Sequence, residues 1–193
     1  MEILNFLENN GLAIWLRESP SILAYPTLLA FHTFGMAFLV GTSVAISLRL
    51  LGFASSVPLA PLRKFFPVMW FGFAISAVSG TLLLILEAER FLTMPAFYIK
   101  LSGIAAALII MRLLLTRVFN AQTVVDPGPV PRKARVLAGA ALISWTVAIT
   151  AGRVTAYLPF VGWQTAAAVL VLTAVLLVGV NFVLRLWGAK ASA

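Results

Sequence analysis

The sequence contains no cysteine, a single histidine and only six acidic residues in a chain of 193. Without cysteine, disulfides, thiolate metal sites and cysteine nucleophiles are all excluded. The acidic residues form no carboxylate pair within an apolar run, and no Ser/His/Asp spacing or glycine-rich phosphate loop occurs. These absences argue against a hydrolase or a transferase, and we expect a non-catalytic protein.

Apolar residues are what the chain has in excess. It is 62% hydrophobic and 10% charged, and its mean hydropathy is +1.04. Soluble domains are about 45–50% apolar and about 25% charged, so this composition indicates a membrane protein. The net charge of +8 does not indicate nucleic acid, because the basic residues lie between apolar runs. The expected partner is the lipid bilayer.

Five apolar runs predict five transmembrane helices, at about 21–48, 66–86, 96–116, 136–157 and 164–186. A hydrocarbon core of ~30 Å needs ~20 residues of helix, and every backbone polar group within it must be paired internally. The fifth run is almost wholly apolar, so we expect four helices in a bundle and one peripheral helix. The predicted fold is a single all-α integral membrane domain over residues 1–193.

The first eighteen residues predict a short helix that lies in the membrane interface or, alternatively, extends the first span. Glu2 and Glu8 would face water, while Phe6 and Trp15 would face lipid or the bundle. The segment lacks the positive region and small-residue cleavage site of a secretory signal, so we expect it to be retained.

The charges between the runs predict an orientation. Ten basic residues fall on one side, accompanied by Asp126 alone, whereas four basic residues and all five glutamates fall on the other. Cytoplasmic loops of membrane proteins are enriched in Lys and Arg. We therefore expect the N-terminus outside and the C-terminus in the cytoplasm.

His32 is the first candidate for a functional residue. Helical spacing places it on one face of the first span with Tyr25, Met36, Ser43 and Ser47. It could be a neutral imidazole bonded to a hydroxyl or carbonyl of a neighbouring helix. Alternatively, it could be a haem ligand, a copper ligand, or a proton- or quinone-binding group, since ionisable groups within spans are often functional.

Neither a haem nor a copper site has a complete ligand set in this sequence. A b-type haem between membrane helices often has two axial histidines, so His32 would need a second histidine from another copy of the chain, or a methionine on another helix such as Met69. Copper is suggested by His32 and Met36, because imidazole and thioether four residues apart project to the same side and suit Cu(I). Two ligands are too few for a tight site, and methionine also fills apolar cores.

Polar residues near the predicted outer surface form a second candidate group, comprising Lys100, Arg153 and Tyr157. The long basic side chains could simply extend to the membrane surface, or pair with Glu87 or Glu89. They could instead form the anionic-ligand end of a pocket with His32 and Met36. Gly72, Ser76 and Gly80, at four-residue spacing in the second span, predict close helix packing.

Several stretches resemble a known family. FHTFGMAFLVGTSVAISLRLLGF, FFPVMWFGFAISAVSG, PAFYIKLSGI and SWTVAITAGRVTAYL are similar to small bacterial multi-pass membrane proteins grouped as a domain of unknown function. More loosely, residues 32–52 resemble the membrane domain of copper-resistance protein D, which would imply that His32 and Met36 contact copper. The resemblance implies a helical protein of the bacterial inner membrane.

Together these observations predict a membrane subunit or small-ligand-binding protein of a periplasm-facing redox or metal-handling system. One alternative is a copper permease-like protein that uses His32 and Met36. A second is a homodimer that binds haem b and relays electrons to quinone. A membrane or periplasmic protein, or a second copy of the chain, is the expected partner.

Overall fold

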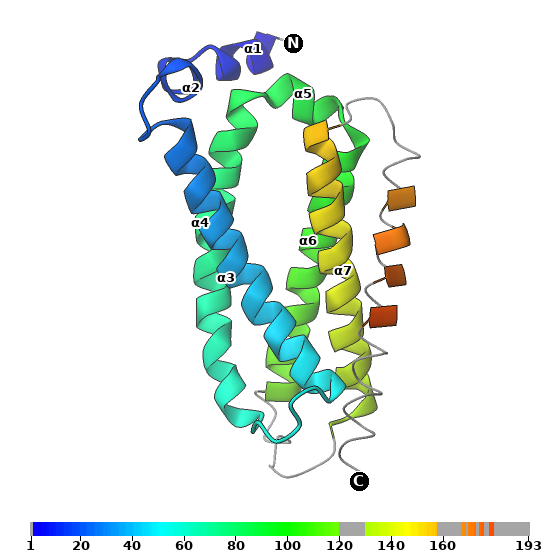
Figure 1. The fold of residues 1–193 in the computed structure, drawn as a ribbon. Helices are drawn as coiled ribbons and strands as arrows, with labels where there is room; N and C mark the ends of the chain where they lie inside the picture. Colours follow the sequence, from blue (N-terminus) through cyan, green and yellow to red (C-terminus); the bar gives the residue numbers. More distant parts are fainter. Residues whose placement is uncertain are drawn as a thin grey trace. The chain divides into compact units, whose positions relative to one another are not determined.

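The structure, a computed structural model, describes residues 2–119 and 130–157 and single positions between 167 and 179. These residues form helices joined by turns, with no strand among them. In chain order the elements are α1 (Glu2–Glu8), α2 (Gly11–Glu18), α3 (Tyr25–Leu51), the 3₁₀ turn η1 (Ala60–Lys64), α4 (Phe65–Leu86), α5 (Ala88–Thr93), α6 (Pro95–Leu114), the π-helical turn η2 (Leu115–Phe119) and α7 (Arg132–Tyr157) (Figure 1).

Four helical stretches are long and apolar enough to cross a membrane, namely Tyr25–Leu51, Ala60–Leu86, Pro95–Phe119 and Arg132–Arg153. The shortest has 22 residues, which rise about 33 Å and therefore match a hydrocarbon core of ~30 Å. The predicted all-helical class and four of the five predicted spans are confirmed. The predicted fifth span, 164–186, lies outside the described residues apart from the single positions.

The N-terminal segment forms two helices where the sequence predicts one, because Asn10 interrupts it. Its side-chain oxygen accepts a hydrogen bond from the Ala13 N–H at 2.9 Å, which caps α2, and its amide donates to the Leu7 carbonyl at 2.6 Å. An asparagine at this position stabilises a helix start and so breaks a continuous helix. A further short helix, α5, lies between the second and third predicted spans.

Helix α3 ends where the sequence provides a glycine. Gly52 has a φ of 106°, a conformation that side chains disfavour. The Phe53 N–H bonds the Leu48 carbonyl and the Gly52 N–H bonds the Arg49 carbonyl, which together make a Schellman cap. The Arg49 guanidinium donates to the carbonyls of Ser55 and Val57, so it holds the turn that follows.

The chain groups into two compact units. The first contains residues 1–42 and 66–94, so it includes α4 and α3 up to Thr42. Its two long helices touch through their backbones: a Cβ built on Gly72 would lie 2.7 Å from the Leu39 nitrogen, and one on Gly35 would lie 2.7 Å from the Ser76 nitrogen. A buried apolar cluster in this unit contains Ala13, Leu16, Ala24, Leu28 and Leu86.

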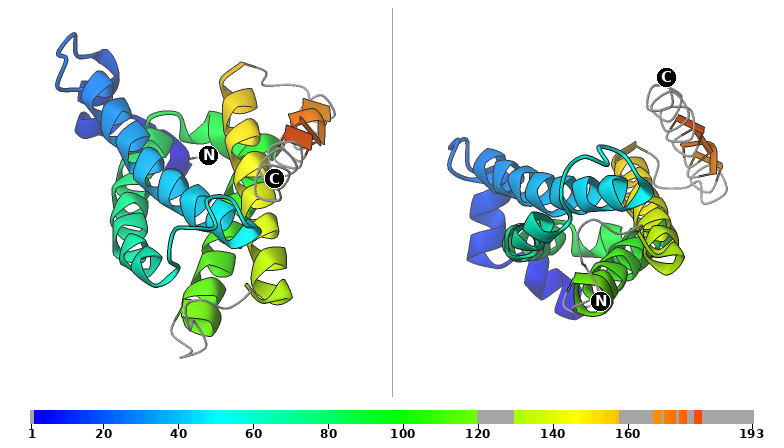
Figure 2. Two further views of the ribbon diagram at one scale, coloured as in Figure 1. Left: turned by 60° about the horizontal axis from the view of Figure 1, so that its bottom comes forward. Right: turned by 90° about the horizontal axis from the view of Figure 1, so that it is seen from below.

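The second unit contains residues 43–65 and 95–193, and its main feature is the pair α6 and α7 (Figure 2). Alanines line the buried side of α7, at positions 134, 138, 141, 148 and 151. Gly103 of α6 lies against this side, since a Cβ there would be 3.0 Å from the Ser144 carbonyl oxygen and 3.1 Å from the Ala148 Cβ. Small residues thus let the two helices approach closely.

Substitution of Gly72 by alanine should destabilise the protein by about 1–3 kcal/mol, because the added methyl would overlap backbone that cannot move aside. The free energy of unfolding in mixed micelles measures the effect. Gly41→Ala is the matched control, since a Cβ at Gly41 in α3 meets nothing within 4 Å. Because alanine favours helix over glycine, this control should be neutral or more stable. Equal stability of the two variants would contradict the close contact.

Candidate functional site

His32 lies half-buried on α3 and its imidazole faces α4. The Nδ1 atom is 3.1 Å from the Ser79 hydroxyl oxygen. The ring also lies against Gly80, because a Cβ built there would be 3.0 Å from the Cε1 atom of His32. Gly80 therefore provides the space for the imidazole, and Ser79 provides its polar contact.

The hydrogen-bond distances of Ser79 favour one tautomer of His32. The Ser79 hydroxyl is 2.6 Å from the Ile75 carbonyl oxygen, a short distance that favours donation of its one proton to that carbonyl. The Ser79 oxygen then accepts from His32, so the proton of the neutral imidazole lies on Nδ1. The Nε2 atom carries the lone pair, which can accept a proton or bind a metal.

Met36 lies one turn after His32 on α3 and is also half-buried. Next to it, Gly35 lies against α4, and the Ser76 hydroxyl donates to the His32 carbonyl at 3.4 Å. No group of three or more His, Cys, Asp or Glu side chains that could hold a metal ion occurs in the described part of the chain. Within the described residues, this site contains the imidazole of His32 bonded to Ser79, and the thioether of Met36 lies four residues further along α3.

Lys100 and Arg153 belong to the second unit, whereas His32 and Met36 belong to the first. The side chain of Lys100 runs along α7, because a Cβ on Gly152 would lie 3.4 Å from its Cδ and 3.6 Å from its Cε. Arg153 is exposed. Within the described residues, no ion pair involves either base. Tyr157 ends α7, and its side chain lies outside the described residues.

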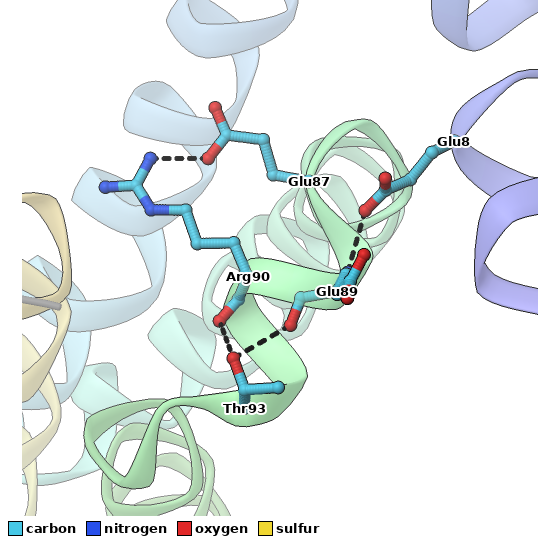
Figure 3. A network of polar contacts seen from close by, with 5 residues as sticks. All are labelled: Glu8, Glu87, Glu89, Arg90 and Thr93. Carbon is cyan, nitrogen blue, oxygen red and sulfur yellow. Dashed lines mark hydrogen bonds and ion pairs between the residues drawn. The ribbon is translucent and has the colours of Figure 1, made fainter. Parts of the chain in front are cut away.

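Glu87, one of the two acids predicted as partners for these bases, pairs instead with a base of its own segment (Figure 3). Glu87 forms an ion pair with Arg90 at 2.5 Å. The Glu89 N–H donates to the carboxylate of Glu8 at 2.7 Å, so Glu8 caps the first turn of α5. The Thr93 hydroxyl donates to the carbonyls of Glu89 and Arg90. The bond between Glu8 and Glu89 attaches α1 to α5 within the first unit.

The second unit has a buried polar contact that involves α3 and α7. The Trp145 Nε1–H donates to the Ser43 hydroxyl at 2.7 Å, and both residues are at most 2% exposed. Ser47, one turn further along α3, is fully buried, and its hydroxyl has no hydrogen-bond partner among the described residues. A tryptophan N–H in an apolar core requires an acceptor, so this contact stabilises the association of the two helices.

Sequence reasoning missed Ser79 and Trp145. The signal for Ser79 was its position three residues after Ser76 and next to Gly80, on the side of α4 that contains the small residues. The signal for Trp145 was its position in mid-span, away from the membrane interfaces where tryptophan is enriched. Ser43 does lie on the predicted face of the first span, but its partner could not be read from spacing.

The four apolar helices make the chain a multi-pass integral membrane protein. Comparisons with models of protein families, with curated proteins and with solved structures find no match. The resemblances to a family of unknown function and to copper-resistance protein D therefore remain predictions from the sequence.

His32 should carry its proton on Nδ1. Because it is the only histidine, ¹⁵N-histidine labelling gives the signals of this one side chain. We expect a protonated Nδ1 resonance and an unprotonated Nε2 resonance in the neutral state. A protonated Nε2 would contradict the hydrogen-bond direction assigned to Ser79.

Ser79→Ala should remove the acceptor for the Nδ1–H and lower the free energy of unfolding by about 1–3 kcal/mol. It should also shift the two ¹⁵N resonances toward a mixture of tautomers. Thr81→Ala is the control, because the exposed Thr81 hydroxyl bonds only to Ala77 of its own helix. Unchanged resonances in the Ser79 variant would show that Ser79 does not fix the tautomer.

Proposed function

We propose that the protein is a non-catalytic integral membrane protein of the bacterial inner membrane, in which His32 binds a small ligand. In this proposal it serves as a membrane subunit or ligand-binding protein of a periplasm-facing redox or metal-handling system. The observation that carries the proposal is the contact of His32 with Ser79, because it fixes the orientation of an imidazole within the helix pair α3 and α4.

The chemistry of this contact supports ligand binding in two ways. Histidines that bind metals commonly donate their other ring N–H to a fixed acceptor, which orients the ring and raises the basicity of the ligating nitrogen. Ser79 is such an acceptor, and its own proton is committed to the Ile75 carbonyl. An imidazole within an apolar helix pair is also costly to retain without a role, which favours function.

Two ligands fit this donor. Cu(I) would bind Nε2 of His32 together with the thioether of Met36, and it would need further ligands from elsewhere. A haem b would bind one His32 from each of two chains. Lys100, Arg153 and Tyr157, predicted from the sequence as contacts for an anionic group, belong to the second unit and are not part of this proposal.

We expect the purified protein to contain copper or haem that is lost in His32→Ala. Absorbance spectra of the oxidised and reduced protein detect haem, and metal analysis after copper loading detects copper. Thr33→Ala is the matched control, since Thr33 is exposed on the same helix and its hydroxyl bonds only to the Leu29 carbonyl. It should retain the wild-type content.

Equal copper in wild type and His32→Ala would reject His32 as a copper ligand, and no Soret band in haem-replete cells would reject haem. If both results are negative, ligand binding by His32 is rejected. A partner that co-purifies in mild detergent would then support only the role as a membrane subunit. A protein that is isolated without ligand and without partner would overturn the proposal.

The orientation that we propose, with the N-terminus outside, can be tested because the chain has no cysteine to label in the background. Glu89→Cys should react with a membrane-impermeant maleimide in spheroplasts, whereas Arg63→Cys should react only after the membrane is opened. Both side chains are exposed in the structure, so burial would not hide them. The reverse pattern would overturn the assignment.

A further inference from the structure

The charges of the chain are divided unequally between its two units. The second unit contains twelve of the fourteen Lys and Arg residues and one of the six acidic residues, Asp126. Both ion pairs found among the described residues, Arg17–Glu18 and Arg90–Glu87, lie in the first unit. The described part of the second unit contains no acidic residue, so its basic residues have no acidic partner there.

Two short turns place several of these bases on one surface. The turn η1 contacts the turn η2. Leu62 and Phe119 are buried at these turns, whereas Arg63, Lys64 and Arg117 are exposed. The apolar residues thus fix the turns to the unit, and the basic side chains project away from it.

The first turn of α7 adds bases at the same end of the second unit. Gly103 lies against Ala148, and Lys100 against Gly152, so α6 and α7 run antiparallel with a defined register. Arg117 lies fourteen residues after Gly103, and residue 134 lies fourteen residues before Ala148. Because the two helices run antiparallel, Arg117 and residue 134 are at the same height along the pair, to within about one helical turn of 5.4 Å. Arg132, Lys133 and Arg135 are exposed there, while Ala134 between them is buried.

These six residues form what we name the basic edge: Arg63, Lys64, Arg117, Arg132, Lys133 and Arg135. Arg49 is not part of it, because its guanidinium already donates to the carbonyls of Ser55 and Val57. Like charges gathered at one end of a unit repel one another unless anions lie between them. The edge lies at the ends of helices that can cross a membrane, where phospholipid phosphates are at hand.

We infer that the basic edge binds the phosphate headgroups of anionic phospholipids, in preference to zwitterionic ones. Guanidinium groups bind phosphate through paired N–H donors, and four of the six residues are arginines. The bases come from three separate segments, so several headgroups can be held side by side. The preference is electrostatic and falls as the salt concentration rises.

The test compares lipid binding by the full chain in nanodiscs made of phosphatidylcholine and phosphatidylglycerol in equal amounts. The lipid that remains with the protein after extraction in mild detergent is measured by native mass spectrometry. For the wild type we expect phosphatidylglycerol to be retained at least threefold over phosphatidylcholine at low salt. This ratio should fall by at least half at 0.5 M NaCl.

The double variant Arg117→Gln with Arg135→Gln should lower the ratio by at least half. The control, Arg17→Gln with Arg90→Gln, removes the same charge from exposed residues of the first unit and should keep the wild-type ratio. Arg117→Lys with Arg135→Lys keeps the charge and should retain most of the preference, which separates loss of binding from misfolding.

Three outcomes would overturn the inference: an equal loss in the edge variant and its control, no preference in the wild type, or displacement of the retained lipid by millimolar inorganic phosphate. The last result would mean that the edge binds free phosphate. None of these outcomes depends on His32, so the proposed function can stand or fail independently.

Discussion

The close approach of α3 and α4 determines the candidate site. The two backbones touch at Gly35 and Gly72, where neither position has room for a side chain. Only at this separation can Ser79 reach across from α4 to the imidazole of His32, and only a glycine at position 80 leaves space for the ring. In an apolar helix pair an imidazole N–H without an acceptor would be strongly unfavourable, so the packing and the polar contact stabilise each other.

The transmembrane helices could be predicted from the sequence because the long apolar runs are a strong signal. Long apolar runs in lipid must be helical, and this argument located four spans to within a few residues. The division of the N-terminal segment into two helices was not predicted. It occurs because the Asn10 side chain accepts a hydrogen bond from the Ala13 N–H, which starts a new helix instead of continuing the first. Likewise, α5 depends on a carboxylate 81 residues away, which no local pattern reveals.

The sequence identified His32 as the candidate site residue, but it did not identify Ser79 as its hydrogen-bond partner. A lone histidine in a span is conspicuous in any sequence, and a hydroxyl on a neighbouring helix was one of the contacts considered for it. Which hydroxyl it would be depends on the rotation of α4 about its axis, and helical spacing alone leaves that rotation undetermined. For the same reason the bond from Trp145 to Ser43 could not be predicted, although each residue taken alone was a plausible core residue.

The hydrogen bond from the Glu89 N–H to the Glu8 carboxylate has a consequence for the order of synthesis. Its acceptor is among the first residues made, and its donor follows 81 residues later. At about 5–20 residues per second, a ribosome needs roughly 4–16 s to make the intervening chain. During that interval α1 has no α5 to contact, so this bond can form only after α3 and α4 have been made. The attachment of the beginning of the chain to α5 is therefore a late contact of its unit.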